Sequence, residues 1–568
     1  MKTPWGEALD ENKILPEYPR PQMARESCLN LNGPWDYAFT DTERIPDAFE
    51  GKILVPFSPE CELSGVGRTL RPGQTLWYRR TFRIPEGFCI GRVLLHFGAV
   101  DQKAAVYVNG REVCSHAGGY TPFGADITEG LREENTLVVK VRDDSDASPY
   151  GRGKQKLVRG GIWYTAQSGI WQTVWAESVP EAYIRSLRVT PLFDEGAVEI
   201  TVLSDSSLPC TAEAGGRTIA FAAGEPAKLP LGEFTPWTPE NPFLYGLTVT
   251  MGQDRVQSYF GMRKFSVGTD EAGIRRLFLN NRPYFQNGLL DQGYYCDGLY
   301  TAPSDEAMVF DIQTAKSMGY NLLRKHIKVE PLRWYYHCDR LGMLVWQDMV
   351  CGGGAYRPLV VSLPALGELR TKDSRYSLFS RGDAQGRAQY IRELEETVAC
   401  LYNTVCVSMW VAFNEGWGQF DAAKACALLR KLDGTRVADH ASGWYDQGAG
   451  EFHSRHVYFR KYRFRPDRLG RAEGLSEFGG YNFRVEGHCF NAKDFGYKKL
   501  RSPGELWDAF AKLYEEQIAP AKKAGLAAAV YTQLTDVEDE LNGLITYDRK
   551  QIKLSPEQVK ALMDRIGR

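Results

Sequence analysis

The sequence predicts three domains: a jelly-roll β-sandwich, an immunoglobulin-like β-sandwich and a (β/α)8 TIM barrel. The 568 residues are too many for a single hydrophobic core, since domains usually contain about 100–200 residues. Residues 1–268 consist of short aromatic and β-branched runs broken by turn residues, a pattern that is typical of β-sandwiches. From residue 269 onward strand-like runs alternate with helix-like runs, which is typical of a barrel.

The first domain is predicted to span residues 1–180 and to be all β. Its clearest strand candidates are TLWYRRTFRI (75–84), RVLLHFGAV (92–100), AAVYVNG (104–110) and NTLVVKVRD (135–143). Asn109-Gly110 favours a tight hairpin, because both residues tolerate a positive φ. Such a pattern suits a jelly roll or another two-sheet sandwich. Residues 181–268 continue with short strands and suit a small immunoglobulin-like sandwich.

The third domain, residues 269–568, contains eight strand candidates. They are 284–291, 321–326, 342–348, 407–415, 436–442, 454–459, 474–480 and 528–536. Helical patterns with apolar residues at i, i+3 or i+4 lie between most of them, at 306–319, 331–342, 388–403 and 420–434. Residues 443–453 and 460–473 carry little helical signal and are predicted as loops, as is the irregular segment 349–380. A barrel of this kind places its active site at the carboxyl ends of the strands.

Composition and charge exclude several classes of protein. The chain has 69 basic and 71 acidic residues and no basic face, so a nucleic-acid partner is not expected. It has no run of about 18 apolar residues, so no membrane span is expected. The first 22 residues lack the apolar run of a signal peptide, and the 12 cysteines include no CxxC pair. We therefore expect a cytoplasmic protein with free thiols, and a homo-oligomer is compatible with this sequence.

Two glutamates follow apolar strand runs in the predicted barrel. Glu415 ends the fourth strand candidate, and Glu477 lies in the seventh, within SEFGG. A carboxylate at the end of a buried strand is costly unless it has a partner or a function. A single glutamate there is more often a salt-bridge partner, here of Arg324 or Arg436. A pair that faces one cavity is what cleavage of a glycosidic bond needs, with one carboxyl protonated and the other ionised.

Several segments resemble glycoside hydrolase family 2. WVAFNEGWG (410–418) is similar to the acid/base segment of that family, and LSEFGG (475–480) is similar to its nucleophile segment. Its sugar-binding jelly roll is resembled by NGPWDYAF (32–39), LWYRRTF (76–82), VYVNG (106–110) and SGIWQTVWAE (168–177). Its immunoglobulin-like domain and the start of its barrel are resembled by GMRKFSV (261–267) and LNNRPYFQNG (279–288). The resemblance covers nearly the whole chain, with the motifs in the family's order.

The resemblance implies a retaining exo-β-glycosidase, which removes the terminal β-linked sugar of a small glycoside or oligosaccharide by double displacement. Glu415 would be the acid/base and Glu477 the nucleophile. Asn414 would bond the 2-hydroxyl of the sugar, while Arg324 and Tyr458 would hold the nucleophile. Other residues near strand ends are candidates for lining the sugar subsite, although each could equally serve packing: Asp291, His326, Asp348, Trp417, Trp444 and Asp536.

The kind of sugar depends on whether the site contains a lysine or arginine that can pair with a carboxylate at C6 of the sugar. The family includes β-galactosidases, β-glucuronidases and β-mannosidases, and its glucuronidases carry an Asn-x-Lys element after the last strand. The matching stretch here has Leu544 in place of the lysine, which favours a neutral sugar, galactose first. Lys325, Lys328 or Arg357 could replace that lysine, which leaves a β-glucuronidase open. Segment 288–303 lacks the His-rich strand-one segment of well-known galactosidases.

No cofactor and no required metal are expected. His453 and His456 are close in sequence, but no other residues with ligand spacing accompany them. Some members of the family do bind magnesium or sodium. An inactive carbohydrate-binding relative on the same fold is the alternative from another functional class, because fold does not imply function. The presence of both carboxylates favours an enzyme.

Overall fold

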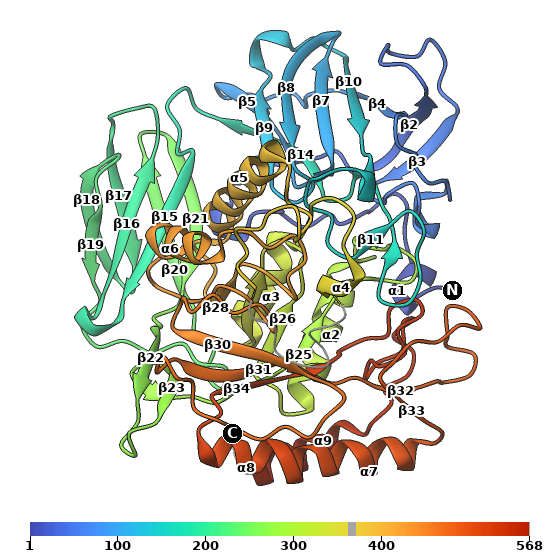
Figure 1. Cartoon of the computed structure of the whole chain (residues 1–568). Helices are drawn as coiled ribbons and strands as arrows, with labels where there is room; N and C mark the ends of the chain where they lie inside the picture. Colours follow the sequence, from blue (N-terminus) through green and yellow to red (C-terminus); the bar gives the residue numbers. More distant parts are fainter. Residues whose placement is uncertain (362–370, 567–568) are drawn as a thin grey trace.

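The computed structural model describes residues 1–361 and 371–566. The chain folds into a two-sheet β-sandwich, a second and smaller sandwich, and a barrel of parallel strands (Figure 1). The predicted fold class is thereby confirmed. In Figure 1 the first sandwich lies above the barrel and the second lies beside it, so that both border the barrel.

The first sandwich pairs a four-stranded sheet with a six-stranded sheet. The four-stranded sheet runs in the order β1 (Leu29–Asn30), β14 (Val174–Val179), β5 (Arg92–Phe97) and β9 (Phe123–Asp126). The other runs β3 (Gly51–Val55), β2 (Gly33–Thr40), β4 (Thr75–Phe82), β10 (Asn135–Arg142), β7 (Lys103–Val108) and β8 (Arg111–Ala117). Asn109 and Gly110 join β7 to β8 with φ values of 52° and 84°, as the hairpin prediction requires.

The second sandwich and a short antiparallel ribbon connect the jelly roll to the barrel. One sheet contains β15 (Ser186–Leu192), β16 (Ala197–Leu203) and β19 (Ala227–Pro230). The facing sheet runs β18 (Arg217–Ala222), β17 (Pro209–Ala214), β20 (Tyr245–Met251) and β21 (Asp254–Phe260). The ribbon consists of β22 (Phe265–Thr269), β23 (Arg275–Leu279) and β24 (Arg282–Pro283).

Eight parallel strands of the described residues form the barrel sheet. In spatial order they are β29 (Val437–Asp439), β28 (Val407–Val411), β27 (Leu344–Asp348), β26 (Leu322–Lys325), β25 (Gln286–Asp291), β34 (Ala528–Thr532), β31 (Ala472–Gly479) and β30 (Phe452–Val457). All eight coincide with the predicted strands. Two end early, however: β28 stops at Val411 and β34 at Thr532. The residues that follow are therefore free to enter the mouth of the barrel as loops.

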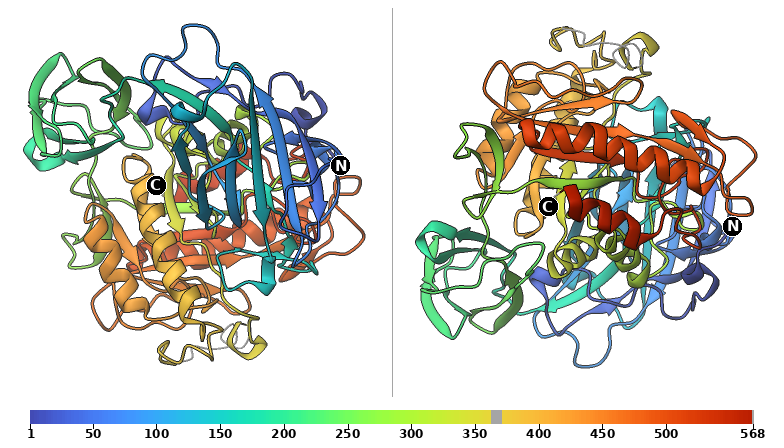
Figure 2. Two further views of the ribbon diagram at one scale, coloured as in Figure 1. Left: turned by 90° about the horizontal axis from the view of Figure 1, so that it is seen from above. Right: turned by 90° about the horizontal axis from the view of Figure 1, so that it is seen from below.

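Helices cover the outside of the barrel. They are α2 (Asp305–Ser317), α3 (Leu332–Leu341), α5 (Ala384–Leu401), α6 (Ala422–Leu432), α7 (Pro503–Leu513), α8 (Ala519–Ala524) and α9 (Pro556–Ile566). Side-chain oxygens cap the first turns: Ser304 accepts from the Ala307 amide at α2, and Asp383 accepts from Gly386 at α5. The right-hand view in Figure 2, seen from below, shows α7, α8 and α9 on the outer surface. The segments predicted as loops, 443–453 and 460–473, contain no helix.

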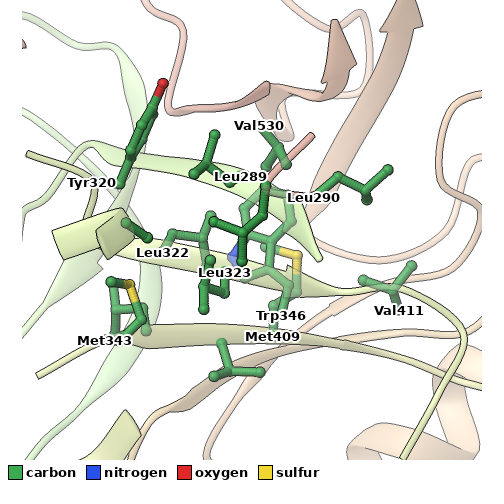
Figure 3. Packing of buried hydrophobic residues seen from close by; sticks show 14 of the residues in the cluster. Leu289, Leu290, Tyr320, Leu322, Leu323, Met343, Trp346, Met409, Val411 and Val530 are labelled. Carbon is green, nitrogen blue, oxygen red and sulfur yellow. The ribbon is translucent and has the colours of Figure 1, made fainter. Parts of the chain in front are cut away.

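The interior of the barrel is a continuous apolar cluster. Leu289, Leu323, Trp346, Met409 and Val530 come from five different strands and pack together (Figure 3). Each of these side chains is at most 1% exposed. Burial on both faces explains why these strands read as uninterrupted apolar runs in the sequence. The polar side chains of the barrel strands therefore gather at its mouth, outside the apolar interior.

Shorter elements shape that mouth. The loop of the jelly roll that reaches the barrel contains β11 (Gln155–Lys156) and β12 (Tyr164–Thr165). The segment after β27 carries the short helix α4 (Pro358–Val361), and is otherwise irregular over 349–357 and 371–380, as predicted; its residues 362–370 lie outside the described part of the chain. The pair β32 (Tyr481–Phe483) and β33 (Lys498–Leu500) follows the seventh strand.

Candidate active site

Two glutamates meet at the mouth of the barrel. Glu415 lies in the loop after β28 and Glu477 lies within β31. Both are nearly buried, with exposed fractions of 8% and 5%. One oxygen of each, together with a ring nitrogen of His456, lie within 4.8 Å of one another. Glu415 has a φ of 51°, a conformation that is uncommon outside glycine and that concentrates at functional sites.

His456, at the end of β30, joins the two carboxylates. Its Nδ1 lies 2.7 Å from Glu415 Oε1, and its Nε2 lies 3.5 Å from Glu477 Oε1. Sequence reasoning considered His456 only as a metal ligand and missed this position. The available signal was period two: His456 and Tyr458 are two residues apart on the same strand candidate, so their side chains face the same side. The prediction that Tyr458 lines the subsite therefore implied that the side chain of His456 lies on the same side.

Arg324 on β26 organises the base of the site. Its guanidinium is fully buried and donates to Glu477 Oε1 over 3.0 Å and to Asn414 Oδ1 over 2.8 Å. It also donates to Asp348 over 2.9 Å and 3.1 Å. Two neighbouring carboxylates would repel each other and resist burial, and a single bidentate cation relieves both effects. Arg324 thus lies where the sequence-based hypothesis places it, against the proposed nucleophile.

The pKa values of the two glutamates shift in opposite directions. Burial raises the pKa of Glu415 and the negative charge of Glu477 raises it further, although the hydrogen bond from His456 opposes the change. Burial acts in the same direction on Glu477, but the positive charges of His456 and Arg324 outweigh it and lower the pKa of Glu477 to about 2. One carboxyl is therefore suited to give a proton and the other to remain an anion.

Tyr458 and Tyr497 cover the nucleophile. The Tyr458 hydroxyl donates to Glu477 Oε2 and lies 3.0 Å from Thr532 Oγ1. The ring of Tyr497 stacks on Tyr458 with centroids 3.8 Å apart. Sequence reasoning included Tyr458 but missed Tyr497, which lies in an irregular stretch beyond the seventh strand. The hydrogen bond favours the ionised form of Glu477, because a hydroxyl donor stabilises a carboxylate.

Three further predicted residues belong to the same network. His326 Nδ1 lies 2.8 Å from Asp348 Oδ2, and the His326 ring lies 6.1 Å from that of Trp417. The ring of Trp444 lies 5.8 Å from that of His456. The structure brings these residues to the catalytic carboxylates, and their contact with a sugar stays a prediction.

Asp291 and Asp536 have structural partners instead. Lys325 Nζ lies 2.7 Å from Asp291, and Lys553 Nζ lies 2.7 Å from Asp536. All four side chains are buried, so each pair neutralises a charge within the wall of the barrel. Their role toward a sugar stays a prediction, since the two ion pairs explain the presence of these aspartates without a ligand.

The jelly roll contributes a charged residue that sequence reasoning missed. Lys154 is 6% exposed, and its Nζ lies 3.4 Å from Glu540 Oε2 in the loop after β34. The hydroxyl of Tyr164 donates to the same carboxylate. The positive charge of Lys154 also acts on the catalytic centre, where it lowers the pKa of Glu415 against the stronger effect of burial. No local pattern marks Lys154, because its partner lies 386 residues away.

A metal ion fits the site poorly. Glu415, His456 and Glu477 have the mutual spacing of a three-ligand group, but the guanidinium of Arg324 lies 3.0 Å from Glu477 and would repel a cation. His453 belongs to a second such group with Asp467 and Glu473, which is bordered by arginines. The hypothesis that no metal is required stays in place on this electrostatic ground.

Comparison with known proteins places these features in a family. A model described as "Glycosyl hydrolases family 2, sugar binding domain" matches residues 67–175. A putative β-glucuronidase of Formosa agariphila is 28% identical over 303 residues, which cover 49% of this chain and 35% of that protein. A β-galactosidase of Thermoanaerobacter pseudethanolicus is 24% identical over 394 residues, 63% of this chain and 47% of that protein. The chain thus spans less than half the length of these two relatives.

Solved structures share the whole architecture. A β-glucuronidase of an uncultured Clostridium species superposes with a TM-score of 0.73 at 18% identity, covering 96% of this chain and 99% of that one. A β-galacturonidase of Eisenbergiella tayi bound to galacturonate gives 0.71 at 19% identity, covering 97% and 100%. These likenesses concern the fold. The matching sugar-binding domain and the sequence relatives support the resemblance of the chain to glycoside hydrolase family 2.

Proposed function

We propose that the protein is a retaining exo-β-glycosidase with Glu477 as nucleophile and Glu415 as acid/base. The observation that carries this proposal is the short separation of the two carboxyl groups, whose nearest oxygens lie within 4.8 Å. Retaining glycosidases hold their carboxyl groups about 5–5.5 Å apart, whereas inverting enzymes need roughly 6.5–9.5 Å to admit a water molecule. The spacing therefore supports direct attack on the anomeric carbon.

Each step has a residue in place. The protonated Glu415 gives its proton to the glycosidic oxygen while the Glu477 anion attacks C1, which forms a covalent glycosyl-enzyme and releases the aglycone. Glu415, now ionised, then takes a proton from water, and the resulting hydroxide equivalent attacks C1 and frees Glu477. Asn414 Nδ2 is buried without a partner among the described residues, so it is free to donate to the 2-hydroxyl of the sugar.

A neutral sugar, with galactose as the first choice, is supported by the state of the nearby cations. Lys325 and Lys328 both bond Glu330, and Lys325 also bonds Asp291. Arg357 is exposed on the excursion after β27. Leu544 is 1% exposed and belongs to the apolar cluster of the barrel. A lysine at this position would therefore have to bury its ammonium group. A uronate carboxylate would thus find these three cations engaged or distant.

A β-glucuronidase is the second candidate, and Lys154 is the observation in its favour. Lys154 is buried beside the catalytic centre, and its separation from Glu540 is long for a charge-assisted bond, at 3.4 Å. Its ammonium group could therefore turn to a substrate carboxylate. Comparing kcat/KM for 4-nitrophenyl β-galactoside and β-glucuronide separates the two candidates. A higher value for the glucuronide would overturn the preference for a neutral sugar and leave the two-carboxylate mechanism untouched.

Azide rescue tests the mechanism. Glu477→Ala should abolish turnover, and added azide should restore it with an α-glycosyl azide as product, because the small anion attacks from the vacated face. Glu415→Ala should retain glycosylation of activated aryl substrates and give a β-glycosyl azide. Full activity of either variant would refute the assignment. Failure of the wild-type chain to cleave any 4-nitrophenyl β-glycoside, with sugar binding retained, would favour the inactive carbohydrate-binding relative.

A further inference from the structure

Three aromatic side chains from separate segments converge beside the acid/base. Trp163 comes from the jelly-roll loop between β11 and β12, Tyr356 from the excursion after β27, and Trp417 from the loop after β28. Ring centroids are 5.1 Å apart for Trp163 and Trp417, 5.7 Å for Trp163 and Tyr356, and 6.2 Å for Tyr356 and Trp417. We call this cluster the aromatic platform. Trp163 and Tyr356 are only partly buried. The Lys156 ammonium lies 4.9 Å from the centroid of the Trp163 ring and the Arg152 guanidinium 4.7 Å from that of Tyr356, so a cation covers part of each ring and the remaining surface is open.

The platform is held in a defined geometry by backbone bonds across two domains. Trp163 exchanges both backbone hydrogen bonds with Gly160, at 2.8 Å and 3.1 Å, which closes a tight turn that presents its ring. The Arg152 amide donates to Cys351 O over 2.9 Å, and the Arg152 guanidinium donates to the carbonyls of Gly353 and Gly354. Because these bonds fix the loops on either side, little conformational entropy remains to be lost when a ligand stacks on the rings.

The platform lies on the leaving-group side of the bond that the proposed reaction breaks. The Trp417 amide donates to Asn414 O over 2.9 Å, so Trp417 and Glu415 belong to one turn. Glu415 must reach the glycosidic oxygen, and the aglycone is therefore next to Glu415. Trp417 is 2% exposed, yet its indole N–H has no partner among the residues that the structure describes. A buried donor without a partner is costly unless a ligand completes it.

Exposed apolar side chains lie near the platform residues and Tyr458 along the chain. Val158 precedes Trp163 in the same loop and is 86% exposed, and Leu359 follows Tyr356 and is 74% exposed. Phe459, next to Tyr458, is 60% exposed and lies 5.4 Å from the ring of Tyr497.

We infer that the aromatic platform is the aglycone subsite and that it selects planar, apolar aglycones such as aromatic alcohols. This inference rests on the proposed glycosidase function and deepens it. A flat ring stacks on Trp163 and Tyr356, where offset aromatic contacts add to the gain from burying apolar area. The Trp417 N–H supplies a donor for an oxygen of the ligand. If the aromatic platform only packed the jelly roll against the barrel, it would need neither the exposed ring surface nor the unpaired N–H of Trp417.

The test compares two substrates that differ only in the leaving group. For the sugar that the wild-type chain prefers, kcat/KM is measured with the 4-nitrophenyl β-glycoside and with the β-glycosyl fluoride, whose fluoride is too small to touch the platform. Trp163→Ala should lower kcat/KM for the aryl glycoside about 10- to 100-fold and leave that for the fluoride within about twofold. Trp507→Ala is the matched control, since Trp507 is a partly buried tryptophan on the outer helix α7.

Equal losses for both substrates in a folded Trp163→Ala variant would assign Trp163 a structural role and overturn the inference, as would no loss for either. The proposed function fails differently, through activity that survives Glu477→Ala or through absence of turnover in the wild-type chain. In that second event calorimetry with 4-nitrophenol alone decides on the platform. Binding that Trp163→Ala weakens about tenfold or more would support it, and binding that is absent or unchanged would refute it.

Discussion

Arg324→Met is expected to move the acid limb of the pH–rate profile to higher pH. Arg324 is fully buried and donates to Glu477 over 3.0 Å, which offsets much of the cost of burying that carboxylate. The pKa of Glu477 is about 2 against an ordinary value of 4.5, a difference that corresponds to about 3 kcal/mol in favour of the anion. Without Arg324 one of the largest effects that oppose burial is lost, while those of His456, His326 and the Tyr458 hydroxyl remain, so we expect the pKa of Glu477 to rise.

The sign of the effect follows from the role of Glu477. Glu477 attacks as an anion, so kcat/KM falls as the pH drops through its pKa. The wild-type enzyme should therefore keep its activity at about pH 4–5, as long as the chain is folded, and Arg324→Met should lose it there. The measurement is kcat/KM for a 4-nitrophenyl β-glycoside in a stopped assay across acidic and neutral pH, with circular dichroism at each point to confirm folding.

Two variants make this test specific. Arg263→Met is the matched control, because Arg263 is also buried but donates to the backbone carbonyls of Thr404 and Val405 rather than to a carboxylate of the described residues. Arg324→Lys keeps the charge and should restore part of the acid limb, even if Arg324→Met folds poorly. A folded Arg324→Met enzyme whose kcat/KM drops by one constant factor at every pH would refute the electrostatic reasoning.

Three further predictions concern other parts of the molecule. Lys154→Met should raise the pKa of Glu415, because the charge of Lys154 lowers it, and the alkaline limb of kcat/KM should therefore shift to higher pH; an unmoved limb would contradict this coupling. Leu544→Lys should cost about 2–5 kcal/mol of stability by burying an ammonium group, read from the urea midpoint; an unchanged midpoint would show that the side chain reaches solvent. All twelve cysteines lie in the described residues and are free, so the unfolded chain should bind twelve thiol labels with or without prior reduction.

Among the described residues no helix is both long and apolar enough to cross a bilayer. The free thiols agree with the sequence-based expectation of unpaired cysteines. The cytoplasmic location and the oligomeric state stay predictions.

The two carboxylates proposed to be catalytic could be selected from the sequence because their signal is local. Each barrel strand is an apolar run that is buried on both faces, and a carboxylate directly after such a run stands out against its neighbours. Glu415 follows its apolar run and Glu477 lies near the carboxyl end of β31, and parallel strands bring these ends to one face. The positions of helices and strands could be predicted equally well, since the periodicity of apolar residues and the turn residues between elements are visible within a few residues. The carboxyl ends of β28 and β34 were harder to predict, because the hydrogen bonding of both strands stops before the apolar run in the sequence ends.

What the tertiary structure alone decided is the environment of those carboxylates. Lys154 and Glu540 lie 386 residues apart and meet only because the jelly roll docks on the barrel. Trp163 reaches Trp417 for the same reason, and no spacing rule connects them. The sequence by itself determined which residues sit at strand ends, because backbone periodicity is local. Which charges and rings surround them depends on the docking of separate domains, and the pKa values and the aglycone surface depend in turn on those distances.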